Sequence, residues 1–179
     1  MDASKGQTNL YCLGMDKEII IKTFMENSNI VSLLMPDYNE LTATQDLDIL
    51  LKDHIYDTIS IDNTQGVARV YICIEAYVPS VDGDAIKEIG IVINVFCPDS
   101  LKTLSKLEKV KYISEQPFYG NRIDVLTDAI DRCLNGKRGI GIGKLRLKPR
   151  SPIGIYQPVN NYYGKSMEYI VSDFNTVKI

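Results

Sequence analysis

Residues 121–147 constrain the fold of this chain more than any other stretch, because they begin with a helix whose two ends are both marked. Asn121 is a residue type that caps helix N-termini, and Asp124 stands where a capping box places its acidic member. The pair Asn135-Gly136 is typical of a helix C-terminus. Between these ends, large apolar residues recur at steps of three and four. We therefore predict a helix that buries one stripe against a small sheet, and the stripe consists of Ile123, Leu126, Ile130 and Leu134.

Two stretches before this helix alternate between apolar and polar residues, as strands do. We predict one strand over residues 69–78 and another over 88–97, joined by the turn-forming residues 79–84 into an antiparallel hairpin. In the second strand, Val92 and Phe96 place apolar groups on the face opposite the isoleucines. We therefore expect that strand to be central and covered on both sides. Further strands are predicted over 140–148 and 168–174.

The N-terminal part of the chain carries a helical pattern. Apolar residues at steps of three and four predict a helix over residues 16–34, in two pieces, with Ser28 or Asn29 capping the second. Pro36 ends this region, because the residue before a proline avoids the helical conformation. A shorter helix is predicted over residues 44–55.

These elements predict a single α+β domain over residues 15–179, in which a small antiparallel or mixed β-sheet packs against helices. A loose, polar N-terminal arm over residues 1–14 precedes it. Two long connections, 98–120 and 149–165, separate core elements. Loops of such length are unusual inside a compact domain, so the first is a candidate contact arm. It has room for one short helix through Leu101, Leu104 and Leu107.

The composition argues against several classes of protein. No apolar run approaches the ~18 residues that cross a bilayer, and the N-terminus lacks the apolar core of a signal peptide. We therefore expect no membrane association and a reducing, cytoplasmic setting. The four cysteines include no close pair, which argues against a zinc site. Three of them lie in apolar periodic segments, and we expect small buried side chains at Cys73, Cys97 and Cys133.

No stretch carries a recognisable catalytic set. The single histidine, His54, has no nucleophile near it in the sequence, so we expect a surface or interface residue. A serine nucleophile elbow and a zinc-binding H-E-x-x-H motif are both missing from the sequence. We therefore expect no enzymatic activity, no cofactor and no metal.

Residues 136–144 are rich in glycine and resemble a phosphate-binding loop at first sight. Such a loop needs a strand before the glycines and a helix after them, so that the helix N-terminus meets the phosphate. Here the order is reversed. We expect these glycines to end the helix and to let two backbones approach closely.

Residues 137–150 hold six basic side chains and no acid, although the whole chain has a net charge of −3. Outside this basic segment 14 basic and 23 acidic groups remain, a net charge of −9. In an extended strand its later charges point to one side and the leucines between them to the other. The candidate contact residues are these charges and the tyrosines that follow: Lys137, Arg138, Lys144, Arg146, Lys148, Arg150, Tyr156, Tyr162 and Tyr163.

Three interpretations of the basic segment stay open. It is a solvated strand face, a contact for an acidic surface such as a neighbouring copy of this chain, or a contact for a nucleic-acid backbone. Lysine and arginine would give the last of these its salt-sensitive attraction. The tyrosines are able to stack on bases, but none stands in a known RNA-binding signature.

Residues 69–174 resemble the tail-terminator and neck proteins of long-tailed bacteriophages. The resemblance rests on the apolar strand over 89–97, the helix NRIDVLTDAIDRCLNG, the stretch GIGIGKLRLK and the closing strand YYGKSMEYIVSDFN. It does not extend to the N-terminal helices or to the 98–120 connection.

The resemblance implies a structural virion protein that forms a homo-oligomeric ring, usually a hexamer, at the head–tail junction. Such a ring ends polymerisation of the tail tube and joins the tail to the neck, so the expected partners are the tail tube protein and a neck or head-closure protein. It would be assembled in the host cytoplasm, and DNA passing through its lumen would make weak, non-specific contacts. The alternatives are a head-closure or connector ring, and a nucleic-acid-binding module that uses residues 144–150.

Overall fold

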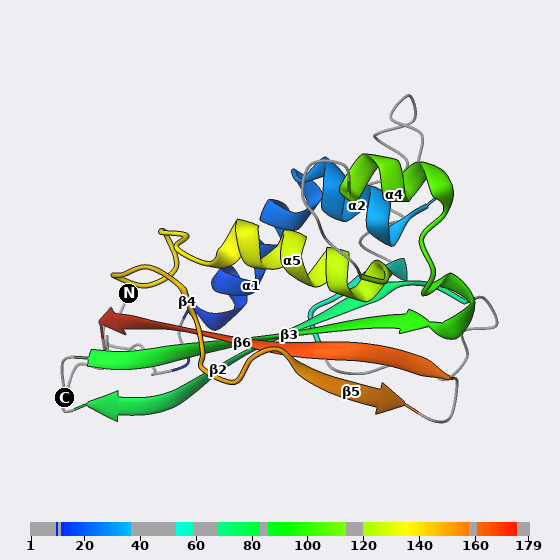
Figure 1. The fold of residues 1–179 in the computed structure, drawn as a ribbon. Helices are drawn as coiled ribbons and strands as arrows, with labels where there is room; N and C mark the ends of the chain where they lie inside the picture. The colour runs from blue at the N-terminus through cyan, green and yellow to red at the C-terminus, as the bar shows by residue number, and fades with distance from the viewer. Residues whose placement is uncertain are drawn as a thin grey trace.

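The protein forms one mixed sheet with its helices gathered on one face (Figure 1). The computed structural model describes residues 10, 12–36, 53–58, 68–82, 86–113, 120–157 and 161–174, without the side chains of 113, 156 and 157. The predicted α+β class is confirmed. The predicted arm over 1–14 and helix over 44–55 lie mostly outside the described residues.

Within the described ranges the sheet has six strands: β1 (Ile55–Tyr56), β2 (Tyr71–Asp82), β3 (Ile86–Pro98), β4 (Arg146–Leu147), β5 (Ile153–Gln157) and β6 (Tyr162–Phe174). Their order is β1-β2-β3-β6-β4, and β5 also pairs with β6. The β1–β2 pair is parallel and the other pairs are antiparallel. Thus β4 and β5 follow one another along the same edge of β6.

Among the described residues, the helices are α1 (Leu13–Met25), α2 (Ser28–Leu34), α4 (Lys106–Ile113) and α5 (Arg122–Leu134), with a 3-10 turn η2 (Asp99–Leu101) after β3. The predicted capping box of α5 is present, since the Asn121 side chain accepts from the Asp124 amide and Asp124 accepts from the Asn121 amide. The break between α1 and α2 is also confirmed, but its cap is Asn27. That side chain accepts two backbone hydrogen bonds, from Asn29 and Ile30.

The main core lies between the helices and the sheet. All four residues of the predicted α5 stripe are buried, and they pack against alternate residues of β3 and β6. A second, smaller cluster lies on the opposite face, where the ring of Tyr71 stacks on Phe96 with centroids 5.0 Å apart. This arrangement confirms that β3 is central and covered on both sides at that end.

Several elements differ from the prediction. The strand β2 continues past Pro79 through a shift of register between Tyr77 and Ser80, where the missing N–H of a proline is tolerated. The strand β5 lies in a predicted loop, and β6 begins at Tyr162. Only Arg146–Leu147 of the predicted 140–148 strand pairs as a strand, because the glycines before it bend the chain.

The 98–120 connection also differs from the prediction. Its longer helix begins at Lys106, so Leu101 and Leu104 lie outside it, and Leu107 is 83% exposed. Within the described residues, the helices are too short or too polar to span a membrane.

Candidate interaction surface on the sheet edge

The basic segment leaves α5 as a loop and then runs along β6. The loop is closed at its base by two backbone hydrogen bonds, from Gly136 to Leu145 (2.7 Å) and from Leu145 to Lys137 (2.9 Å). Further bonds tie Ile142 to Ser172 and Lys148 to Glu168. The segment is therefore held to the sheet edge along most of its length.

The glycines of this loop end α5 and let the backbone approach β6 closely, as their order in the sequence predicts. Gly136 ends α5 with a φ of 89°, which favours glycine over other residues. Gly141 has a φ of 62°, and a Cβ atom on it would lie 2.4 Å from the carbonyl oxygen of Ser172. The glycines thus allow close approach of the loop to β6, and no helix N-terminus follows them.

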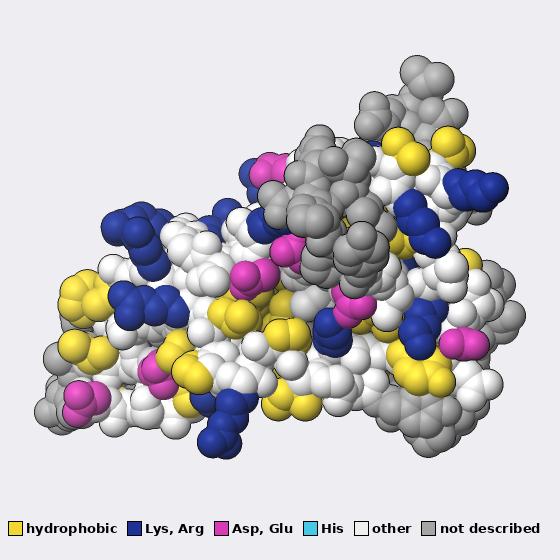
Figure 2. All heavy atoms as spheres, in the orientation of Figure 1, with side chains coloured by type: hydrophobic (Ala, Val, Ile, Leu, Met, Phe, Trp, Pro, Cys, Tyr) yellow, Lys and Arg dark blue, Asp and Glu magenta, His cyan; other side chains and the backbone are white. Residues whose placement is uncertain are grey.

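The charges of the basic segment point outward. Leu145 is buried and Leu147 is half-buried, whereas Arg138, Lys144, Arg146, Lys148 and Arg150 are exposed. Lys137 is half-buried. In Figure 2, Lys and Arg side chains gather over the loop between α5 and β4 in the left half of the view, with a further group below β4.

Lys148 is the exception, because its side chain forms an ion pair with a residue of the sheet. Its Nζ lies 2.8 Å from Oε1 of Glu168, which also accepts a hydrogen bond from the Tyr77 hydroxyl. Burial would raise the pKa of Glu168, but the bonds from Lys148 and Tyr77 outweigh it and hold the pKa below its ordinary value. The ring of Tyr77 lies over Gly90, where any Cβ atom would clash with it. Among the described ion pairs, Lys148 is the one residue of the basic segment with an acidic partner.

The three candidate tyrosines do not join this surface as expected. Tyr162 is 6% exposed and belongs to the small aromatic cluster, so its role as a contact residue is wrong. Tyr163 is 37% exposed, and Nζ of Lys102 lies 4.2 Å from its ring centroid. By the register of β6, it faces the helix side of the sheet, opposite to Ile170, the partner of Arg146. Tyr156 pairs with Tyr163 through β5, and its side chain is outside the description.

His54 is not a surface residue, which corrects the prediction. It is 8% exposed, and its Nδ1 lies 2.6 Å from the carbonyl oxygen of Val70. Burial lowers the pKa of this imidazole. It therefore pins the start of β2 from inside the protein.

The cysteines mostly follow the prediction. Cys73 and Cys97 are buried, and burial raises the pKa of each thiol to about 12. Cys133 is only half-buried and accepts a hydrogen bond from Asn27. No group of three His, Cys, Asp or Glu side chains within the described ranges is placed to hold a metal ion.

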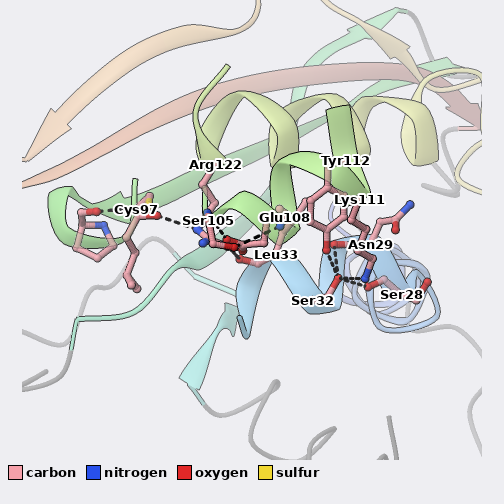
Figure 3. A network of polar contacts seen from close by, with 12 residues as sticks. Ser28, Asn29, Ser32, Leu33, Cys97, Ser105, Glu108, Lys111, Tyr112 and Arg122 are labelled. Carbon is pink, nitrogen blue, oxygen red and sulfur yellow. Dashed lines mark hydrogen bonds and ion pairs between the residues drawn. The ribbon is translucent and has the colours of Figure 1, made fainter. Parts of the chain in front are cut away.

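No pattern in the sequence indicates the role of Arg122, the first residue of α5. Its side chain is 3% exposed, and its guanidinium contacts Glu108 of α4 at 2.6 Å and the carbonyl oxygen of Leu33 (Figure 3). It also donates a hydrogen bond to the carbonyl oxygen of Leu101. Four segments therefore meet at one buried arginine. The helix dipole disfavours a positive charge at a helix N-terminus. A basic residue there is therefore ordinarily expected to extend its side chain into solvent.

Comparison with known proteins gives one family. The profile of the YomW family matches residues 27–171, which run from the cap of α2 almost to the end of β6. No curated protein matches the chain. The match covers most of the chain, so the chain belongs to the YomW family.

Proposed function

We propose that this member of the YomW family is a structural protein of the phage particle. Copies of it form a ring, with six subunits as the expected number, at the junction of head and tail. The ring ends polymerisation of the tail tube and joins the tail to a neck or head-closure protein. The observation that carries this proposal is the basic segment, held rigidly along one edge of the sheet in a chain that is acidic elsewhere.

A ring places the same edge of every subunit at the same radius. The basic segments would then form a band of positive charge, which suits a lumen through which DNA passes. Arg138, Lys144, Arg146 and Arg150 are exposed side chains on a fixed backbone, and they would contact phosphates without reading bases. Such contacts are weak and independent of sequence, as the passage of DNA requires.

Two alternatives use the same surface. A head-closure or connector ring would place the basic band one ring further from the tail. A nucleic-acid-binding module would use the basic segment as a monomer. The displacement of Tyr162 and Tyr163 from the basic surface weighs against base stacking there, and so against the second alternative.

Removal of this protein from assembling particles is the first test of the ring. Particles assembled without this protein should carry tails of uncontrolled length, or finished tails without heads, in negative-stain images. Purified protein should form rings, measured by light scattering and imaging, either alone or on isolated tail tubes. Tails of normal length joined to heads would contradict the proposal.

The basic band is tested by charge reversal. Lys144→Glu with Arg146→Glu should remove a salt-sensitive affinity for duplex DNA, and should leave the fold intact because both side chains are exposed. Lys148 stays unchanged because it holds Glu168. The matched control is Lys22→Glu with Arg132→Glu, which reverses two exposed charges on α1 and α5. Equal DNA binding by the two double variants would exclude the band as the DNA contact, and strong DNA binding by a monomer would favour the module.

A further inference from the structure

The short helix α4 exposes an apolar pair that its position does not explain. Leu107 is 83% exposed and Val110 is 66% exposed, and residues three apart share one face of a helix. Lys106 and Lys109 are exposed on the same helix. Lys111 is not counted with them, because its Nζ donates to Ser32 of α2. We call Leu107, Val110, Lys106 and Lys109 the α4 knob.

The opposite side of α4 is fixed to the body of the protein. Glu108 binds the buried guanidinium of Arg122, and Tyr112 hydrogen-bonds to Ser32 of α2. Figure 3 shows both contacts on the side of α4 that faces α2 and α5. The orientation of the knob is therefore set by the fold.

A second exposed apolar pair lies at the far end of the sheet. Ile86 is 41% exposed, and its cross-strand partner Phe174 is 59% exposed. On the same face, Asp82 pairs with Ile86, and Glu88 lies two residues further along β3. We call these four residues the sheet-end patch.

The knob and the patch complement one another. Each has two apolar side chains at its centre, two lysines flank the first, and two carboxylates border the second. Contact between them would bury both apolar pairs and would place opposite charges together, which selects this pairing over knob-on-knob or patch-on-patch contact.

The two surfaces cannot meet within one chain. The strand β3 runs from the patch toward η2 and α4, and its 13 residues span about 40 Å at ~3.3 Å per residue. Figure 1 shows α4 at the upper right and the patch end of β2, β3 and β6 at the left. The occupant of each surface is therefore another molecule.

We propose that this occupant is a second copy of the chain, so that the α4 knob of one subunit packs on the sheet-end patch of the next. Such a contact joins two different surfaces, and repetition closes it into a ring or extends it as a filament. The inference rests on the proposed ring, for which it names the subunit contact. The apolar area at the centre is small, so ionic attraction carries much of the pairing, and added salt weakens it.

Disulfide trapping tests this contact directly. Val110→Cys and Ile86→Cys are prepared as separate proteins, mixed and oxidised. The mixture should give a cross-linked dimer several-fold faster than either protein alone, with wild type as the control for its own four cysteines. Equal cross-linking within one of the separate proteins would show a symmetric contact and overturn the proposal, as would no excess in the mixture.

Charge reversal provides the second test, and it needs no reactive thiol. Lys106→Glu with Lys109→Glu reverses the knob, and Asp82→Lys with Glu88→Lys reverses the patch. Each double variant alone should lose self-association in sedimentation velocity, and a mixture of the two should recover heterodimers. Lys22→Glu changes an exposed residue of α1 that belongs to neither surface, and it should associate like wild type.

The outcomes separate the contact from the function. If rings form normally on tails with the reversed knob, the contact is wrong and the ring stands. If wild-type protein forms no ring on tails and gives no trapped dimer, both are wrong. Rings lost with the reversed knob and restored by mixing with the reversed patch would establish the contact.

Discussion

Arg122 and Glu108 form an ion pair at 2.6 Å that ties α4 to the start of α5, and Arg122 is almost completely buried. The guanidinium also donates to the carbonyl oxygens of Leu101 and Leu33, so most of its hydrogen-bonding capacity is used inside the protein. The 98–120 connection is thus an ordered arm over its described part. The orientation of α4 depends on this arginine together with the contact between Tyr112 and Ser32.

Replacing Arg122 should be among the most damaging single changes in the chain. Arg122→Met should lower the free energy of unfolding by about 3–5 kcal/mol, because Glu108 and two carbonyl oxygens lose their partner. Urea denaturation measures the loss. Glu108→Gln should cost less, because an amide still accepts a hydrogen bond from Arg122. A loss under about 1 kcal/mol for Arg122→Met would mean that the arginine does not organise the arm.

The same pair predicts a response to acid. Burial would raise the pKa of Glu108, but hydrogen bonds from Arg122 and Ser105 prevail and place the pKa below its ordinary value. A carboxyl whose pKa is lowered by folding adds stability above its unfolded pKa, and that stability is lost as the pH falls through the folded pKa. Wild type should therefore lose more stability in acid than Glu108→Gln does, as measured by urea denaturation between neutral pH and about pH 3.

The sequence predicted those elements whose signals are local. The capping box at Asn121, the α5 stripe and the alternation in β3 each depend on residues within a few positions, and all are present. The glycine order likewise indicated a close backbone approach, now seen at Gly141. Local spacing was sufficient because these features are formed by neighbours in the sequence.

Features that depend on distant partners were missed. Tyr162 lies in a loop-like stretch with prolines, and only the stacking of Tyr71 and Phe96 across three strands explains its burial. His54 is buried because the start of β2 folds over it. The spacing of residues along the chain does not indicate the contacts that bury Tyr162 and His54. The sequence therefore predicted which charged residues are exposed on the candidate surface, but it did not predict that Tyr162 is buried away from it.

The attachment of the basic segment to β6 should depend on Gly141. Gly141→Ala places a Cβ atom against the Ser172 carbonyl oxygen at a φ of 62°, and we expect a loss of about 1–3 kcal/mol in stability. Faster amide exchange at Ile142, which donates to that carbonyl, should accompany it. Gly154→Ala is the control, because no atom lies within 4 Å of its Cβ position. Equal stability of the two variants would contradict the close approach.

His54 should make the protein sensitive to mild acid. Burial is the main cause that lowers its pKa, so below the ordinary value of 6.5 the unfolded chain binds a proton that the folded chain does not. Stability should fall as the pH drops through about 6.5. His54→Gln keeps a side-chain amide near Val70 and should remove this part of the pH dependence. An unchanged slope in the variant, measured by thermal unfolding across this range, would place the titration elsewhere.

Asp16 should make the protein less stable as the pH rises, which is the opposite of the effect expected from His54. It is 6% exposed in the first turn of α1, and burial, with a contribution from Asp173 and against the attraction of Lys87, raises its pKa from 3.8 to about 6. Above pH 6 the folded protein holds a charge that its surroundings disfavour, whereas below about pH 4 both states bind the proton.

Asp16→Asn should therefore stabilise the protein by about 1–3 kcal/mol at pH 7.5, and the gain should vanish near pH 4. Urea denaturation at the two pH values measures the difference, with Lys87→Met as the companion variant. A loss of stability in Asp16→Asn at pH 7.5 would show instead that the attraction of Lys87 for the Asp16 carboxylate outweighs the burial of that carboxylate.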